Sequence, residues 1–445
     1  MRPGQLWIVI VTCLMFGSGI LAVLADQASA AEKPVPDTQQ KLTLIHAGTL
    51  LAVPGQAPAR KQTLYIRGEK IEKIVAGYQR EDGAKIINLE DSFVLPGLID
   101  SHVHLAFEFG PNIRLETVTK RPGDLAYDAL VNAQKTLLAG FTTVQDVGGP
   151  YEIFALRDAI NAGKVAGPRI HASGPALSPT GGHGDIHGYR EDVMQALARP
   201  SVCDGVADCR RATRHAIKMG ADVIKITATG GVLSNTAAGT SQQFTKDELE
   251  AIVQAAHMMG REVTAHAHGK DGIDSALKAG INSIEHGSYL DVQSTELFKQ
   301  HKAMLIPTVL AGMTVVEWAK TNNWLPPASK AKALKVGPQM LDMLHIAYSN
   351  GVTIAFGTDS GVSKHGQNAR EFGYMVEAGM SEMDAIKAAT LTGAKHLGMS
   401  KQIGTLAPGK FADLIAVRGN PLEDITKLQS VDFVMKGGVV YKGGK

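Results

Sequence analysis

Seven side chains at or near the ends of apolar segments have the types and spacing of a metal site. His102 and His104 are separated by one residue, and a strand turns every second side chain to the same face, so both imidazoles would point the same way. An isolated pair of this kind is equally compatible with two core histidines. Further polar groups occur in or after other apolar segments, and neutral imidazole with carboxylate suits Zn, Fe or Mn better than Ca or Mg. The full set is His102, His104, Lys225, His266, His268, His286 and Asp359.

The chain contains eight apolar, β-branched segments that end in polar or glycine residues, and five of them contain these side chains. Helical patterns separate them, such as 247–259, where Thr245 and Glu248 form a capping box at the start. Parallel strands alternating with helices predict a (β/α)8 TIM barrel over 96–398, within the α/β class. A doubly wound open sheet is the alternative, but no GxGxxG follows an early strand. The segments are 93–105, 140–149, 167–178, 221–231, 261–269, 281–288, 302–310 and 351–361.

The sequence pattern at both ends of the chain differs from the pattern of this middle part. Residues 31–95 and 399–445 contain short alternating segments separated by turn residues, which is typical of β-strands joined by tight turns. We therefore expect the two ends to meet in one small β-sandwich domain.

The composition limits the classes of function. With 445 residues, 44% hydrophobic residues and 20% charged residues, the chain has ample core material for a globular protein. The formal net charge of +2 provides no field to hold a polyanion, which argues against a nucleic-acid partner.

The first 30 residues form a separate segment. Arg2 provides a positive start, 6–25 is almost wholly apolar, and Ala28-Ser29-Ala30 offers the small residues that a signal peptidase requires. We predict a signal peptide over 1–30 and an exported protein, periplasmic or extracellular. An apolar segment of this length could also stay uncleaved as an N-terminal anchor, and otherwise we expect no stable membrane partner.

Cys203 and Cys209 are separated by five residues in a polar stretch. In an oxidising compartment they could close a small disulfide loop. Two free surface thiols are the alternative. A two-cysteine zinc site is disfavoured, because no histidine or second cysteine pair lies close by in sequence.

Five motifs in order, GLIDSHVHL, VIKI, TAHAHG, SIEHGS and GTDSG, together resemble the amidohydrolase superfamily. The resemblance is to its binuclear zinc dipeptidase group, which is prolidase-like and includes Xaa-Pro and Xaa-Arg dipeptidases and ochratoxin-hydrolysing amidases. It covers nearly the whole chain after the first segment. The segment IGTLAPGKFADLIAV is similar to the motif at which the chain of such enzymes re-enters the small β-sandwich domain after the barrel.

The resemblance implies roles for individual residues. His102 and His104 would bind the more buried metal with Asp359, and His266 and His286 would bind the second. Lys225 would be carboxylated by CO₂ and bridge both metals, most often zinc. Carboxylation would also avoid the free-energy cost of burying an unpaired lysine ammonium. A lysine whose ammonium forms a salt bridge is the alternative. His268 shares the face of His266 and is assigned to substrate binding rather than to a metal.

Further substrate contacts are expected beside the metals. The glycine-rich loop 178–189 contains His183, which the resemblance makes a candidate to contact a substrate carboxylate or the scissile carbonyl and to take part in catalysis. A histidine that only holds the loop together is the alternative. Tyr289, three residues after His286, is a further candidate for substrate binding.

These residues suit metal-assisted hydrolysis, in which two cations lower the pKa of a water held between them. Asp359 would accept the proton of that water and return it to the leaving amine, or serve only as a ligand. We expect a small-molecule substrate, a dipeptide, an N-acyl amino acid or an ochratoxin-like amide, and a homo-oligomer. A lactonase, phosphotriesterase or cyclic-amide hydrolase with the same metals is the alternative, and a catalytically silent binding protein would lack a ligand, whereas none is missing here.

Overall fold

The computed structural model describes residues 41–234 and 239–444. The predicted signal peptide, 1–30, lies outside the described residues. Within the described ranges, no helix has the length and apolar character needed to span a bilayer.

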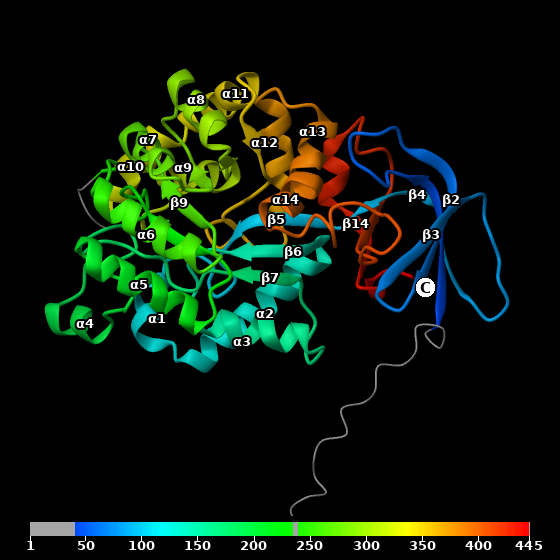
Figure 1. Cartoon of the computed structure of the whole chain (residues 1–445), viewed down its shortest axis with the longest axis horizontal. Coiled ribbons are helices and arrows are strands. Elements are labelled where there is room, and N and C mark those ends of the chain that lie inside the picture. Colours follow the sequence, from blue (N-terminus) through cyan, green and yellow to red (C-terminus); the bar gives the residue numbers. More distant parts are fainter. Residues whose placement is uncertain (1–40, 235–238, 445) are drawn as a thin grey trace, which may run out of the picture. The chain divides into compact units, whose positions relative to one another are not determined.

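Strands from both ends of the described chain form one seven-stranded sheet in the order β15-β14-β13-β4-β1-β2-β3. Figure 1 shows β14 in the same part of the molecule as β2, β3 and β4, although most of the chain separates them in sequence, and β13 lies between β14 and β4 in the sheet. The strands are β1 Leu42–Leu50, β2 Ala59–Arg67, β3 Lys70–Ala76, β4 Lys85–Pro96, β13 Leu414–Val417, β14 Val431–Lys436 and β15 Val439–Lys442.

Strand β4 joins the two halves of this sheet. It runs parallel to β1 and antiparallel to β13, where Leu95 lies opposite Ile415. The last hairpin, β14 to β15, turns at Gly437 and Gly438, whose φ angles of 54° and 72° are those that a tight hairpin turn needs at both central positions. Residues with side chains would be strained there.

Each of the eight predicted strand segments contains a strand of the structure. They form two parallel sheets, β5-β6-β7 and β8 to β12 in sequence order, so the middle of the chain is α/β. The strands are β5 Leu98–Val103, β6 Phe141–Asp146, β7 Arg169–Ala172, β8 Ile224–Thr227, β9 Val263–Ala267, β10 Ser283–His286, β11 Met304–Ile306 and β12 Thr353–Ile354.

Isolated bridges link the edges of these two sheets. Leu177, after β7, forms a parallel bridge with Ile226 of β8, and Val103 of β5 forms one with Ser360, after β12. At the second junction, the Asp359 amide donates to the His102 carbonyl at 2.8 Å, which brings the predicted ligands of β5 and β12 together.

Helices follow most of these strands and pack against them. Helix α2 contacts β6, α3 contacts β7, α5 contacts β8 and α7 contacts β9. The predicted capping box is confirmed at the start of α6, where Thr245 and Glu248 exchange hydrogen bonds. The α-helices are α1 Ile113–Thr119, α2 Pro122–Leu138, α3 Glu152–Asn161, α4 Glu191–Ala196, α5 Gly205–Met219, α6 Lys246–Met258, α7 Lys270–Lys278, α8 Val292–His301, α9 Val309–Thr321, α10 Pro327–Val336, α11 Gln339–Ser349, α12 Glu371–Glu377, α13 Glu382–Lys387 and α14 Gly393–His396. Short η segments are η2 Asn368–Arg370, η3 Ala388–Thr392 and η4 Ile425–Gln429.

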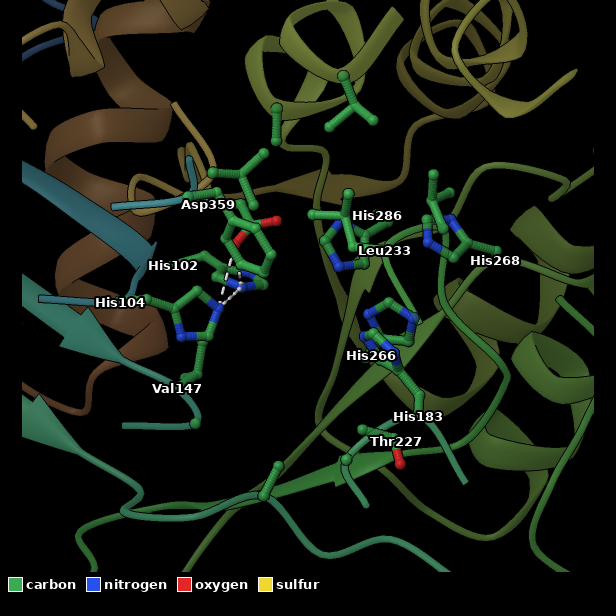
Figure 2. Close-up of a pocket in the computed structure, with 18 of the residues that line it drawn as sticks. His102, His104, Val147, His183, Thr227, Leu233, His266, His268, His286 and Asp359 are labelled. Atoms are coloured by element: carbon green, nitrogen blue, oxygen red, sulfur yellow. Dashed lines mark hydrogen bonds and ion pairs between the residues drawn. The ribbon is translucent and has the colours of Figure 1, made fainter. Parts of the chain in front are cut away.

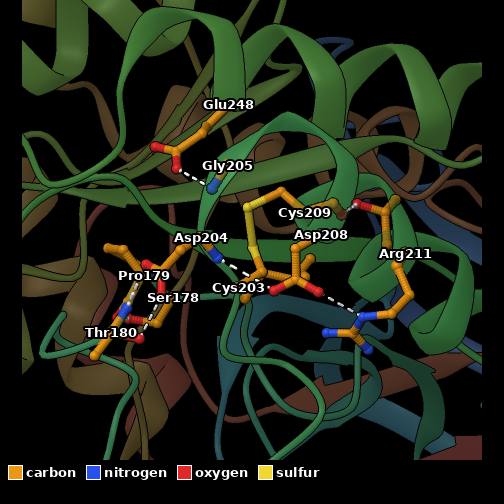
Figure 3. The surroundings of a disulfide bond; sticks show 12 residues. Ser178, Pro179, Thr180, Cys203, Asp204, Gly205, Asp208, Cys209, Arg211 and Glu248 are labelled. Carbon is orange, nitrogen blue, oxygen red and sulfur yellow. Dashed lines mark hydrogen bonds and ion pairs between the residues drawn. A yellow bond between two sulfur atoms is a disulfide. The ribbon is translucent and has the colours of Figure 1, made fainter.

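The structure joins Cys203 and Cys209 in a disulfide (Figure 3). Their polar sequence surroundings suggested an exposed loop, but Cys209 lies in helix α5 and both residues are buried. The amide of Cys203 donates to the carbonyl of Ser178 at 3.0 Å. The disulfide is therefore directly connected to Ser178, the first residue of the predicted substrate loop, although the two lie 25 residues apart in sequence.

Candidate metal centre

The parallel strands deliver the predicted ligands to one pocket. His102 lies in β5, Lys225 in β8, His266 in β9 and His286 at the end of β10, while Asp359 follows β12. His104 and His268 come just after β5 and β9 and line the same cavity of about 330 Å³. Figure 2 shows His102, His104 and Asp359 on one side of the pocket and His266, His268 and His286 on the other.

The first group is His102, His104 and Asp359, whose ligand atoms all lie within 4.8 Å of one another. One carboxylate oxygen of Asp359 is 3.3 Å from His102 Nε2 and 3.1 Å from His104 Nε2. Burial opposes ionisation of this carboxyl, but the imidazoles of His102 and His104 more than compensate and hold the pKa of Asp359 well below its usual range. The carboxylate form, which a metal requires, is therefore favoured.

Glu285 orients His102 from the opposite side of the ring. His102 Nδ1 lies 2.7 Å from Glu285 Oε2, and the other carboxylate oxygen of Glu285 accepts from the hydroxyl of Thr264. A carboxylate on one ring nitrogen places the proton there and leaves the lone pair of the other nitrogen for a metal. Glu285 thus keeps His102 Nε2 available on the pocket side.

A second carboxylate, Asp100, connects the two segments that carry the first group. It accepts hydrogen bonds from the amides of His102 and Thr358, each at 3.1 Å, and from the Thr358 hydroxyl at 2.6 Å. Burial raises the pKa of Asp100 to about 6. Sequence analysis missed Asp100 and Glu285, although both lie inside the quoted motifs.

The second group is His266, His268 and His286, with ligand atoms likewise within 4.8 Å. His268 Nδ1 lies 2.7 Å from the Ser288 hydroxyl and His286 Nδ1 lies 2.7 Å from the Thr308 hydroxyl. Burial is the main cause that lowers the pKa of all three, to about 4 for His268 and further for the others. The rings are therefore neutral near pH 7 and can offer lone pairs.

The backbone is strained where this geometry is most demanding. His286, Thr308 and Asp359 have φ angles of 72°, 51° and 54°, in the left-handed region that favours glycine. Such strain persists only where the surroundings enforce it, and it is concentrated at functional sites. Strand alternation would turn the side chains of neighbouring Glu285 and His286 to opposite faces. Both nevertheless act on the site, Glu285 through its hydrogen bond with His102 and His286 by lining the cavity.

Lys225 is the one ammonium group buried in this cluster, and its Nζ has no hydrogen-bond partner among the residues that the structure describes. Burial lowers its pKa, against the opposing charges of Glu285 and Asp359. His266 Nε2 is likewise buried without a partner in the described ranges. Orphaned nitrogen atoms beside neutral imidazoles and a carboxylate are the donor set expected for a divalent transition metal, so the residues fit a metal centre.

His183 lies against the second group. Its ring centroid is 4.2 Å from that of His266, its Nδ1 contacts the Ser234 hydroxyl, and its amide donates to the Gln243 side chain at 2.9 Å. Burial lowers the pKa of His183 to about 3, so the ring is neutral. The structure thus brings His183 to the cavity, as sequence analysis expected, and fixes one of its nitrogens.

Tyr289 differs from that expectation. It is not among the described residues that line the cavity, and its buried hydroxyl has no partner within the described ranges. Its backbone amide donates to the His268 carbonyl at 3.0 Å. A substrate contact by Tyr289 therefore stays a prediction, and the contact that the structure gives to the site is this backbone hydrogen bond.

Comparison with known proteins then decides the family, since a profile of the amidohydrolase family matches residues 93–441. The chain belongs to the amidohydrolase family. It is 35% identical over 433 residues to an ochratoxinase of Aspergillus niger, covering 91% of this chain and 88% of that protein. A solved Xaa-Pro dipeptidase with bound methionine is 42% identical, with a TM-score of 0.85, and covers 91% of this chain and 100% of its own. A prolidase complexed with N-methylphosphonate-L-proline is 32% identical, with a TM-score of 0.83 and coverage of 91% and 100%. This amidohydrolase is therefore an enzyme, a metal-dependent hydrolase of amide bonds.

Proposed function

We propose that this amidohydrolase cleaves the amide bond of dipeptides or N-acyl amino acids, ochratoxin-like amides included, with two zinc ions. One observation carries the proposal: two groups of three ligands, each within 4.8 Å, line one cavity together with a buried lysine that has no partner in the described part of the chain. Single-metal sites need only one such group.

The described side chains suggest how two ions would be held. His102, His104 and Asp359 would hold the first, and His266 and His286 the second. Lys225, carboxylated on Nζ, would contribute one oxygen to each. A carbamate changes the buried lysine from an unpaired cation into an anion, which removes the cost of an isolated ammonium. His268 stays assigned to substrate, although the geometry also brings it within ligand distance of His266 and His286.

When bound, two divalent ions lower the pKa of a water and polarise a carbonyl. Asp359 would accept the proton of the attacking water at a carboxylate oxygen and pass it to the leaving nitrogen. The Asp359 carboxylate would start the reaction deprotonated, because its pKa lies well below its usual range. His183, neutral and fixed at Nδ1, would orient the scissile carbonyl with its remaining ring nitrogen.

The cavity wall supports a substrate with an apolar part. Beyond the ligands it is lined largely by apolar side chains, among them Phe107, Phe109, Val232, Leu233 and Val315. The similar solved proteins hold methionine and a phosphonate derivative of proline, and the curated relative is an ochratoxinase. Small amides of amino acids are the substrates that these observations share.

Architecture, location and assembly complete the proposal. The bridges between β7 and β8 and between β5 and β12 support a closed (β/α)8 barrel, with the seven-stranded sheet as its β-sandwich domain. The domain limits proposed are 31–95 with 399–445 for the sandwich and 96–398 for the barrel. A cleaved signal over 1–30, an exported protein and a homo-oligomer are proposed as well; the disulfide agrees with an oxidising compartment.

A hydrolysis screen with metal analysis on the same sample tests the proposal. The substrates are dipeptides, N-acyl amino acids and ochratoxin A, with lactones, phosphotriesters and cyclic amides as the competing set. We expect about two divalent ions per chain and turnover only in the amide set. Turnover confined to the competing set would refute the assigned substrate class, and one ion per chain at full activity would refute the binuclear centre.

A further inference from the structure

Arg199 is the cationic side chain that lines the cavity away from the ligand groups. It lies in the segment between α4 and α5, and the residue is exposed to solvent. Within the described ranges its guanidinium makes no hydrogen bond or ion pair. Tyr151 and Asp185 lie close enough to act on its charge, and an arginine stays charged at any working pH.

An acidic side chain that lines the same cavity already accepts hydrogen bonds from its own loop. Asp185 also lines the cavity, and its two carboxylate oxygens accept from the amides of Gly181 at 2.8 Å and Ile186 at 2.7 Å. No contact within 4.0 Å joins Asp185 to Arg199 in the described structure. Asp185 therefore stabilises its own loop, and the guanidinium of Arg199 is left for an anion from outside the chain.

The backbone that carries Arg199 is fixed to the support of His183. The amide of Val202 donates to the Arg199 carbonyl at 3.1 Å, and Ser178 pairs with Val202 in a parallel bridge. The Ser178 hydroxyl also accepts from the amide of Gly184, the residue after His183, at 3.1 Å. The disulfide of Cys203 then ties this segment to α5 (Figure 3). The backbone at Arg199 is thus held in place, so only its exposed side chain has to be ordered when a ligand binds.

We propose that Arg199 binds the free α-carboxylate of the substrate's C-terminal residue and so makes the enzyme selective for amides of unblocked amino acids. The proposal rests on the proposed function and names its selectivity. A guanidinium offers two parallel N–H donors that match the two oxygens of a carboxylate. A solvent-exposed charged group and apolar side chains that line the same cavity together favour an amphipathic substrate.

The test compares Ala-Met with Ala-Met-NH₂, which lacks the terminal charge. In Arg199→Gln we expect kcat/KM for Ala-Met to fall about 10- to 100-fold, mainly through KM, as loss of hydrogen bonds to a charged group does. The value for Ala-Met-NH₂ should not change. Arg199→Lys should lose less kcat/KM for Ala-Met than Arg199→Gln, because lysine keeps the positive charge but lacks the two parallel N–H donors. Arg214→Gln, on α5 and outside the cavity lining, is the matched control.

A binding measurement keeps the two proposals separate. Calorimetry of methionine and methioninamide needs no turnover, and Arg199→Gln should weaken methionine binding alone. An equal loss for both ligands, or no loss relative to Arg214→Gln, would overturn the role of Arg199 even in an active enzyme. If the wild type binds methionine through Arg199 but hydrolyses no dipeptide, the proposed function fails instead. Ala-Asp-NH₂, with its only carboxylate on the side chain, should be a poor substrate, and selective loss of its turnover in Arg199→Gln would assign Arg199 to acidic side chains.

Discussion

Gly231 gives a sharp test of how the cavity positions His183. A Cβ atom at residue 231 would lie 2.2 Å from Cε1, 2.4 Å from Nδ1 and 2.5 Å from Nε2 of the His183 ring. Ordinary contact begins near 3.4 Å, so Gly231→Ala would have to displace the ring by about 1.2 Å. The ring cannot yield freely, because His266 lies on it and Ser234 binds its Nδ1.

A displacement of about 1 Å in a positioning group can reduce the rate on the order of 10²-fold. We therefore expect Gly231→Ala to lower kcat/KM for a dipeptide by about that factor, with metal content unchanged. Steady-state kinetics, metal analysis and thermal unfolding of the same preparations measure it. Gly373→Ala is the control: a Cβ atom there meets nothing within 4 Å, and alanine favours the helix α12.

A double-mutant cycle tells whether the loss passes through His183. In a His183→Ala background the cause of the clash is absent, so Gly231→Ala should cost almost nothing more. Wild-type kinetics in Gly231→Ala would refute the reasoning. So would an equal loss with and without the His183 ring, which would assign the effect to the loop backbone instead.

Four further predictions follow from the site and its supports. Lys225→Ala should abolish activity, with partial rescue by short carboxylic acids or bicarbonate; wild-type turnover would remove Lys225 from the site. Asp359→Asn should lower kcat by about 10²-fold or more with metal retained, since an amide cannot accept the water's proton; near-normal kcat with two metals would leave Asp359 as a ligand only. Replacing Cys203 and Cys209 by alanine should lower the free energy of unfolding by about 2 kcal/mol, as expected for so short a loop; two free thiols in denatured, unreduced exported protein would contradict the bridge. Burial raises the pKa of Glu371 to about 8, so the folded state holds a proton that the unfolded state loses near its ordinary pKa, and the free energy of unfolding should fall as pH rises from about 4.5 to 8, by at most about 5 kcal/mol. Urea unfolding of Glu371→Gln should lack that slope, and an unchanged slope would exclude Glu371 as its source.

The sequence predicted the parts of the site that depend on local order. The spacing of His102 and His104, and the position of each polar group in or after an apolar segment, follow from strand geometry, so these side chains could be listed as candidate ligands before their contacts were known, while their individual roles came from the family resemblance. The eight strand segments were found for the same reason, although β12 is only two residues long and carries its aspartate on irregular backbone.

Contacts between distant segments could not be read from the sequence. The hydrogen bond from His102 to Glu285 joins residues 183 positions apart, and Gly231 matters only because the His183 ring lies on its backbone. The sequence proximity of Tyr289 to His286 does not state where its side chain points, so its proposed contact with substrate stays a prediction. Arg199 stood in a polar segment without any motif, and only the cavity wall distinguishes it from a surface arginine.

The pairing of β4 with β13 has a consequence for the order of synthesis. Phe93–Pro96 of β4 pair with residues 414–417, more than 300 positions later, so one edge of the first four strands has no partner until the ribosome has synthesised residues 414–417. An apolar strand edge in that state is open to pairing with other chains. A chain that stopped before residue 414 would therefore contain every proposed ligand and still expose this edge of β4 to pairing with other chains.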